Sequence, residues 1–246
     1  MSLTIRFLGA GDAFGSGGRF QTCFLGETED TRFLIDCGAT SLVAIKRAGI
    51  DPCAIETIFL THLHGDHFGG LPFFLLDARF SKRKAPLAIV GPRSSEARIM
   101  AVLELFYPGA TSVPLGFPVT FHALNDNQPL TVNGITVTGH LVEHPSGAHA
   151  FAIQIEAGGK KIGYSGDTSW CGGIVRAAAG CDLFIAEAYG WDRSRRHHLD
   201  HATLAANAGE LTARRILVTH MDDGVLAHLS DSPFEAADDG RVVNVL

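Results

Sequence analysis

Apolar and polar positions along this chain follow two alternating patterns, one typical of strands and one typical of helices. Residues 4–8, 57–60 and 183–186 are short apolar or β-branched runs of strand length. Residues 71–80 and 203–214 have helical character, with apolar residues recurring on one face of the second segment. Strands and helices that alternate in this way predict an α/β fold.

The same pattern predicts further elements and shows no boundary between domains. No linker and no repeat of about 20–50 residues interrupts it, so residues 1–246 are expected to form one domain. Residues 108–129, rich in Pro, Gly and Asn, carry no clear prediction. Strands are expected at residues 23–25, 32–35, 88–90, 135–141, 150–156, 161–164 and 216–219, and helices at residues 40–48 and 94–107.

The composition narrows the class of protein. Hydrophobic residues make up 46% of the chain and charged residues 19%, which is typical of a globular protein. No apolar run approaches the roughly 20 residues that a membrane helix needs, and the N-terminus lacks the pattern of an export signal. Five cysteines without a Cys-x-x-Cys pair indicate reduced thiols, which favours the cytoplasm.

The net charge of −6 makes long nucleic acid an unlikely partner, because proteins that grip it usually carry a basic surplus or stripe. Two dense basic clusters, residues 82–84 and 193–196, are interpreted as solvated loops. A small anionic substrate is compatible with this charge where metal ions supply local positive charge.

Residues 61–67 contain four side chains that can bind a metal ion: His62, His64, Asp66 and His67. His62 and His64 are two positions apart, so in an extended segment they point to the same side. Asp66 and His67 follow Gly65, which permits a sharp turn and can direct them towards a second point. The spacing differs from the helical His-Glu-x-x-His pattern and favours two metal ions side by side.

This segment, Thr-His-Leu-His-Gly-Asp-His, resembles the signature of the metallo-β-lactamase superfamily, whose fold is a four-layer αββα sandwich with the site at one edge. Later motifs of the superfamily follow in order: His144 in Glu-His-Pro-Ser-Gly, Asp167 in Tyr-Ser-Gly-Asp-Thr and His220 in Leu-Val-Thr-His-Met-Asp. The resemblance implies that one ion is held by His62, His64 and His144, the other by Asp66, His67 and His220, with Asp167 bridging.

The residue types agree with this chemistry. Asp167 and His220 each follow an apolar segment of strand length, where ligands can converge at one sheet edge. Nitrogen and carboxylate donors without thiolate suit Zn²⁺, with Mn²⁺ or Fe as alternatives. Two such ions about 3.5–4 Å apart can share a water and lower its pKa towards about 7. Two carboxylates against two dications leave a net charge of about +2, which attracts an anionic group such as a phosphodiester.

Other residues compete for places in the site. His140 and His149 are alternatives to His144 as the third histidine. His140 lies inside a predicted strand and His149 opens the next one, so both are expected to be ordinary polar or core residues. Cys37 follows a strand end and is expected to be a buried thiol rather than a ligand.

A second informative region is the strand that leads into Glu187, followed by His201-Ala202-Thr203. It resembles ribonuclease Z and its relatives among phosphodiesterases and arylsulfatase-like hydrolases, where a glutamate orients a histidine of a His-x-Thr motif that helps the leaving group depart. The resemblance makes Asp66, Glu187 and His201 the expected catalytic residues. The alternative is that His201 is a surface residue at a helix start and Glu187 a salt-bridge partner.

The chain departs from ribonuclease Z in two places. Only 22 residues separate His144 from Asp167, where ribonuclease Z carries a flexible arm for tRNA. After His220 the chain reads Met-Asp-Asp-Gly, where ribonuclease Z has an arginine. A dedicated role in tRNA processing is therefore not expected.

Three functions fit these observations. The expected one is a dinuclear hydrolase of a phosphodiester or a related small anionic ester. The second is a hydrolase of a sulfate ester, lactone or thioester on the same metal ions. The third is a fold-retaining protein that binds a small molecule or metal, which the complete ligand set disfavours. A homodimer is compatible with the resemblance.

Overall fold

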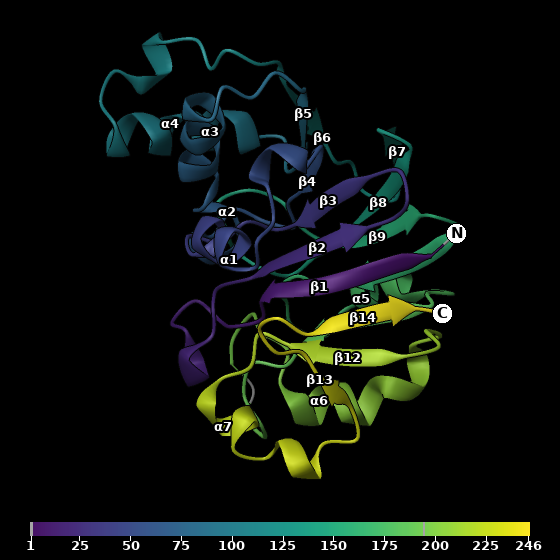
Figure 1. The fold of residues 1–246 in the computed structure, drawn as a ribbon. Helices are drawn as coiled ribbons and strands as arrows, with labels where there is room; N and C mark the ends of the chain where they lie inside the picture. The colour runs from purple at the N-terminus through teal and green to yellow at the C-terminus, as the bar shows by residue number, and fades with distance from the viewer. Residues whose placement is uncertain (1, 194) are drawn as a thin grey trace.

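The computed structural model describes residues 2–193 and 195–246. These residues form two seven-stranded sheets that pack face to face, with helices on the outer faces (Figure 1). The four-layer α/β architecture expected from the sequence is confirmed. None of the described helices is long and apolar enough to cross a membrane.

The first sheet contains the N-terminal strands and the last strand of the chain. In spatial order it consists of β14 (Val242–Val245), β1 (Leu3–Gly9), β2 (Cys23–Glu27), β3 (Arg32–Ile35), β4 (Thr57–Phe59), β5 (Leu87–Gly91) and β6 (Val119–Ala123). β3 to β6 are parallel, whereas β1 pairs antiparallel with both β2 and β14. The two ends of the described chain therefore lie side by side in one sheet (Figure 1).

The second sheet is built from the C-terminal half. In spatial order it consists of β13 (Glu235–Ala236), β12 (Ile216–Thr219), β11 (Leu183–Glu187), β10 (Lys160–Tyr164), β9 (Ala150–Ala157), β8 (Ile135–Val142) and β7 (Pro129–Val132). β10 to β13 are parallel, and β7 to β10 are antiparallel. β9 and β10 occupy most of the interval between His144 and Asp167, where the sequence predicted no room for an arm.

Helices and 3₁₀ turns follow the strands of each sheet. They are α1 (Ser41–Arg47), α2 (Gly65–Phe68), α3 (Leu71–Phe80), α4 (Ser95–Phe106), α5 (Gly172–Ala178), α6 (His201–Asn207) and α7 (Asp223–Leu226), with turns η1 (Ser16–Gly18), η2 (Pro52–Ala54), η3 (Ala110–Ser112), η4 (Ala208–Glu210) and η5 (Leu229–Asp231). The helix expected at residues 203–214 is thus shorter and starts earlier. Residues 108–129, which carried no prediction, contain η3 and the edge strand β6.

The alternation of side chains along the strands produces three apolar layers. On β1, Leu3, Ile5 and Phe7 lie in the core between the sheets, while Leu8 packs in the layer beneath α1 and α3. A third apolar cluster lies between the second sheet and helices α5 and α6. Each sheet is therefore covered on both faces, as the αββα sandwich requires.

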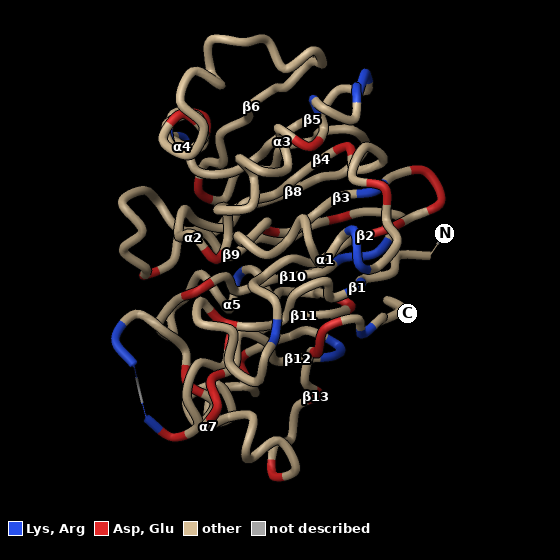
Figure 2. The backbone as a smooth tube through the Cα atoms, turned by 60° about the vertical axis from the view of Figure 1, so that its left-hand side comes forward, with Lys and Arg blue, Asp and Glu red and all other residues tan. Residues whose placement is uncertain are grey.

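The basic cluster at residues 82–84 is not simply a solvated loop. Arg83 is 4% exposed, and its guanidinium donates to the carbonyl oxygens of Ala85, Ile55 and Pro86 at 2.7, 2.7 and 2.6 Å. The interpretation as a solvated loop is wrong for Arg83, because the buried carbonyl groups before β4 and before β5 need a hydrogen-bond donor. In the second cluster, residue 194 lies outside the described residues. Figure 2 shows acidic and basic residues interspersed along the described chain.

Candidate metal centre

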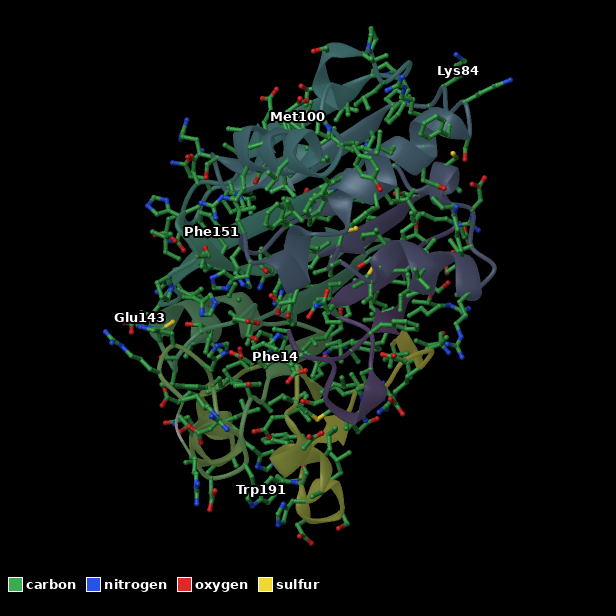
Figure 3. All side chains as sticks on the ribbon, turned by 90° about the vertical axis from the view of Figure 1, so that its left-hand side faces the viewer. Phe14, Lys84, Met100, Glu143, Phe151 and Trp191 are labelled. Carbon is green, nitrogen blue, oxygen red and sulfur yellow. The ribbon has the colours of Figure 1, made fainter. Side chains whose placement is uncertain are left out.

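The expected metal ligands come from segments that follow strands of both sheets. The strands β1, β3 and β12 all run towards the left-hand edge in Figure 1. Figure 3 faces this side of the molecule and labels Phe14, Glu143 and Trp191 on the segments around it. His62 and His64 follow β4, Asp66 and His67 lie in α2, and His144, Asp167 and His220 follow β8, β10 and β12.

The first group of donors consists of His62, His64 and His144, whose ligand atoms lie within 4.8 Å of one another. His144 Nε2 is 2.9 Å from His64 Nδ1. Nε2 of both His62 and His144 is 3.9 Å from Oδ2 of Asp167. Asp167 therefore faces this group of three imidazoles.

The second group consists of Asp66, His67, Asp167 and His220. Nε2 of His67 is 3.2 Å from Asp66 Oδ2 and 3.3 Å from Asp167 Oδ1. Nε2 of His220 is 3.2 Å from Asp66 Oδ2 and 3.5 Å from Asp167 Oδ2. Four donors placed about 2.0–2.1 Å from a zinc ion in a tetrahedron are separated by about 3.3 Å, so this spacing fits an ion.

Several of these donor atoms are buried without a hydrogen-bond partner among the described residues. They include Nε2 of His62, Nε2 of His67 and Oδ1 of Asp167. Buried polar groups are normally paired, and each unpaired one costs stability. Clustered imidazole and carboxylate donors of this kind bind divalent metal ions, which would satisfy all three atoms.

The protonation states of Asp66, Asp167, His62 and His144 suit metal binding. Burial alone raises the pKa of Asp66 and Asp167, but neighbouring histidines outweigh it, and the pKa of both falls below the usual value. Burial lowers the pKa of His62 well below its usual value and that of His144 to about 4. The carboxylates are therefore ionised and these two imidazoles neutral, which are the forms that bind metal. Burial lowers the pKa of His67 and His220, but the carboxylates around them outweigh it and raise the pKa of both, that of His220 to about 8, so the imidazoles of His67 and His220 must lose a proton when a metal binds.

Asp36 supports the site from behind. This buried carboxylate accepts hydrogen bonds from the backbone N and Oγ1 of Thr61, both at 2.8 Å, and pairs with His67 Nδ1 at 2.7 Å. Burial raises its pKa, and the charge of His67 opposes that shift. Such partners fix the ring orientation of a metal-binding histidine. The sequence analysis passed over Asp36, although it precedes Cys37 at the end of β3.

The backbone that presents Asp167 needs a glycine. Gly166 has a φ of +58°, and a Cβ there would lie 2.9 Å from the carbonyl oxygen of Phe151 and 3.2 Å from Cβ of Thr61. Both the left-handed conformation and the close approach favour the residue without a side chain. The Ser-Gly-Asp-Thr sequence thus places Asp167 between the two histidine groups.

Glu187 binds a different histidine from the one expected. Its Oε1 is 2.5 Å from Nδ1 of His198, and its Oε2 accepts from the backbone N of Thr168 and Leu199 at 2.9 and 3.2 Å. The His198 side chain is 24% exposed, and its Nδ1 is 3.9 Å from Asp167 Oδ2. His198, which the sequence analysis missed, therefore lies at the edge of the metal centre.

His201 lies away from this cluster, so its expected pairing with Glu187 is wrong. Its Nε2 is 2.8 Å from Oγ of Ser232, and its ring stacks on Trp191 with centroids 4.1 Å apart. The cause is the start of α6: Asp200 caps the helix by accepting from the backbone N and Oγ1 of Thr203, both at 2.8 Å. An Asp-x-x-Thr pair is a recognisable helix start, and it could have excluded His201.

The other rival residues also lie outside the cluster. His140 Nδ1 is 2.7 Å from Oδ1 of Asn127, and His149 is exposed on the connection before β9. Cys37 is buried, and burial raises the pKa of its thiol well above the usual value. The structure therefore brings His144, and neither of the other two histidines, together with His62 and His64.

Known proteins resemble this chain along most of its length. The uncharacterized protein Rv1339 of Mycobacterium tuberculosis is 30% identical over 202 residues, which cover 76% of this chain and 69% of that protein. The short form of human tRNase Z aligns with a TM-score of 0.80 and 25% identity over 99% of each chain. The metallo-β-lactamase fold protein YhfI of Bacillus subtilis aligns with a TM-score of 0.79 and 20% identity, covering 99% of this chain and 100% of that one.

The likeness to YhfI concerns the fold alone, and together with tRNase Z it confirms the resemblance inferred from the sequence motifs. The family model described as anti-Pycsar protein Apyc1 matches residues 3–234. That match spans nearly the whole chain, including every histidine and aspartate of the two donor groups. The chain therefore belongs to the anti-Pycsar protein Apyc1 family and has the metallo-β-lactamase fold.

Proposed function

We propose that this protein is a dinuclear metal-dependent hydrolase that cleaves a phosphodiester or a related small anionic ester. The observation that carries the proposal is the position of Asp167, which lies between the two groups of donors and within 4 Å of both. Its Oδ2 lies 3.9 Å from the imidazoles of His62 and His144 and 3.5 Å from that of His220, while its Oδ1 lies 3.3 Å from that of His67. A carboxylate with this arrangement is suited to bridge two ions.

Zinc is the proposed metal, with manganese or iron as alternatives. Each ion would receive nitrogen and carboxylate donors and no thiolate, because the nearby Cys37 is not part of either donor group. Two divalent ions bound here would supply Lewis-acid activation of water at neutral pH. The chain's own contribution is to hold the donors in place, as Asp36 does for His67.

His198 is the proposed acid for the leaving group. A carboxylate can only accept a hydrogen bond, so an ionised Glu187 holds the proton on Nδ1 of His198. To act as an acid, His198 would be in its imidazolium form, whose second proton, on Nε2, passes to the leaving oxygen. Glu187 is fully buried, whereas part of the His198 side chain is exposed. This pair can therefore hold and transfer a proton beside the metal centre, in the role first expected of Glu187 and His201.

A cavity lined by the segments that follow Glu187 and His220 offers room for the rest of the substrate. It has a volume of about 540 Å³ and is lined by Trp191, Arg193, Arg195 and Asp222, among others. Arg195 stacks over Tyr189, whose ring centroid lies 4.8 Å from that of His198. Cavities of this size hold small molecules. Its two arginines can contact an anionic group, but Asp192 and Asp222 in the same lining balance their charge, and Asp222 lies 3.7 Å from Arg195.

The net positive charge at the metal centre is smaller than the value of about +2 expected from the sequence. That value used two carboxylates, whereas Asp36 and Glu187 add two more carboxyl groups close by. Burial raises the pKa of both, and wherever they are ionised they offset the charge of the ions. Attraction of an anionic substrate therefore depends on the metal ions, because the two aspartates of the cavity balance its two arginines.

The remaining proposals concern the chain as a whole. Because the donor groups combine segments of both sheets, we propose that residues 1–246 act as one domain. All five cysteines are free thiols, which supports a reducing compartment such as the cytoplasm.

The decisive experiment is a substrate screen on metal-free and metal-loaded protein. Chelator-treated protein is reloaded with Zn²⁺, Mn²⁺ or Fe²⁺ and tested with a bis-aryl phosphate, an aryl sulfate, a lactone, a thioester and precursor tRNA. We expect metal-dependent hydrolysis of the phosphate diester, little cleavage of tRNA, and no activity in a parallel Asp167→Ala preparation. Turnover of another ester alone would shift the assignment to the second function. Metal binding without turnover of any of them would favour a binding protein.

A further inference from the structure

A second cavity, of about 390 Å³, lies on the outer face of the first sheet. It is bounded by β1, the end of α1, the loop before β2 and the turn before β14, and its lining includes Arg6, Leu8, Phe20, Arg47 and Asp239. None of the metal-binding candidates and no part of the Glu187–His198 pair lines it. It is therefore a separate site from the metal centre.

The two arginines of this cavity have no acidic partner. None of the ion pairs among the described residues includes Arg6 or Arg47, whereas Arg19, Arg32 and Arg215 each have one. The Nε of Arg6 is buried and makes no hydrogen bond to any described residue. A buried guanidinium N–H is normally satisfied by an acceptor, so the charge and hydrogen-bonding capacity of Arg6 are not fully used within the described residues.

Asp239 does not neutralise the arginines directly. Its carboxylate accepts hydrogen bonds from the backbone N of Ala10 at 2.9 Å and of Phe20 at 2.8 Å. Two arginines against this one carboxylate leave the lining with a charge of 2 − 1 = +1, in a chain whose net charge is −6. Figure 2 shows basic segments beside α1, β1 and β2. The cavity is thus a local positive site on an acidic protein.

The rest of the lining is apolar and partly aromatic. Leu8 and Ala44 form part of its wall, and the guanidinium of Arg47 lies over the ring of Phe20 with Cζ 5.8 Å from the centroid. An arginine fork binds carboxylate, phosphate or sulfonate oxygens in pairs, and the apolar wall can cover a planar or aliphatic group. We propose that this cavity binds a small organic anion that joins one such acidic group to an apolar or aromatic body.

Ala10 connects the cavity to the metal centre by hydrogen bonds on both sides. Ala10 donates its N–H to Asp239, and its carbonyl oxygen accepts from the backbone N of His220 at 3.2 Å and from Oγ1 of Thr219 at 3.3 Å. The metal centre itself attracts anions, so a test must separate binding at the two places. Substitution of the arginines does so, because neither belongs to the proposed catalytic machinery.

The test measures benzenesulfonate binding to the metal-loaded protein by isothermal titration calorimetry. This probe combines an aromatic ring with an acidic group. It contains no ester bond, so the proposed hydrolase cannot cleave it. We expect a site that Arg6→Gln weakens by about tenfold or more, as removal of a charge-assisted bond does, with a smaller loss in Arg47→Gln. The matched control is Arg32→Gln, which removes an exposed arginine of β3 that pairs with Glu27 and should leave binding unchanged.

Two further probes define the ligand class. Benzyl alcohol, which lacks the acidic group, should not bind, and inorganic phosphate should bind more weakly than benzenesulfonate because it has no apolar body. Thermal unfolding verifies that each variant is folded. If Arg6→Gln does not fold, the binding measured with Arg47→Gln, a change at an exposed position, decides the test. Absence of benzenesulfonate binding at millimolar concentration, or binding that persists unchanged in both arginine variants and so belongs to the metal centre, would overturn the proposal.

Discussion

Replacing His198 with alanine should slow the hydrolysis of substrates with a poor leaving group, while the same change at His201 should leave hydrolysis nearly unchanged. The reason is the position of the two rings. His198 pairs with Glu187 at 2.5 Å and lies 3.9 Å from Asp167, whereas His201 bonds to Ser232 behind Trp191. The two residues are three positions apart, so the comparison separates two roles within one short segment.

The expected size of the effect at His198 follows from its proposed role. Transfer of a proton to the leaving oxygen typically contributes about 10²–10⁴-fold, which corresponds to about 3–5 kcal/mol of transition-state stabilisation. An alkoxide needs that proton, whereas nitrophenolate departs readily as an anion. His198→Ala should therefore lower kcat by about 10²-fold or more on an alkyl diester and far less on a nitrophenyl diester. Glu187→Gln should show the same selectivity more weakly.

At His201 the change should reduce stability rather than catalysis. The residue is 3% exposed, and alanine removes both its hydrogen bond to Ser232 and its stacking on Trp191. The hydrogen bond contributes about 1 kcal/mol and the aromatic contact about 0.5–1.5 kcal/mol. A loss of about 1.5–2.5 kcal/mol in the free energy of unfolding should lower Tm by several degrees.

The assay compares kcat on the two diesters with metal content and Tm for each variant. Selective loss in His201→Ala, with normal behaviour in His198→Ala, would refute the geometric assignment. Equal losses on both diesters in His198→Ala would indicate substrate positioning instead of proton transfer. Loss of metal in His198→Ala would make this residue a ligand, since it also forms a donor group with Asp167, Glu187 and His220.

Three further predictions test other parts of the structure. Asp167→Ala should reduce bound metal from two ions per chain towards none and abolish hydrolysis, as elemental analysis would show; one ion in the wild type, retained in the variant, would contradict a bridging role. Arg83→Ala should lower the free energy of unfolding by about 3 kcal/mol in denaturant titrations, because it leaves buried carbonyl groups unpaired, whereas Lys82→Ala should be neutral. Arg215 and then Arg241 hydrogen-bond Glu235 and lower its pKa from 4.5 to about 2; Glu235→Gln should therefore cost less than about 1 kcal/mol at neutral pH, given its exposure. That difference should disappear as the pH falls from about 4.5 towards 2, since a depressed carboxylate pKa stabilises only above it.

The sequence predicts those residues of the site that belong to short motifs at the ends of strands. His62, His64, Asp66 and His67 are contiguous, so their meeting requires only a local turn after β4. Asp167 and His220 follow apolar parallel strands, whose carboxyl ends share one edge of a sheet. The layers of the fold follow from the same alternation of strands and helices. These features depend on local pattern and on general rules of sheet topology.

Other features depend on contacts between segments far apart in the chain. β14 pairs with β1, more than two hundred residues away in sequence, and nothing in its four residues specifies that partner. Arg83 looks like part of a solvated basic cluster, and only the tertiary structure shows the carbonyl groups of Ile55 and Pro86 around it. Asp36 pairs with His67 across 31 positions. Burial and partner identity of this kind are not encoded in local periodicity.

The exchange of His201 for His198 has a narrower cause. Both follow Glu187 closely, and a match to a His-x-Thr motif selects the one that precedes Thr203. Local backbone physics decides otherwise, because Asp200 caps α6 and the first helical residue turns into the packing of Trp191 and Ser232. If the helix start is recognised first, two histidines remain after Glu187 on the irregular segment before the cap, His197 and His198. Only the structure shows that His198 is the one that reaches Glu187.

Backbone strain and unpaired buried groups both occur at the edge that carries the metal centre. Asp36 and His220 adopt left-handed φ values of +57° and +56°, which are uncommon for residues with side chains. The buried atoms without partners include donors of both groups, among them Nε2 of His62 and of His67. Conformations and desolvated groups of this kind cost stability and persist where function requires them. Metal binding would compensate for part of that cost, because it stabilises the folded state in which the donors are already assembled. The strained conformations at this edge and its proposed capacity to bind metal thus have one physical origin, the close assembly of buried donors.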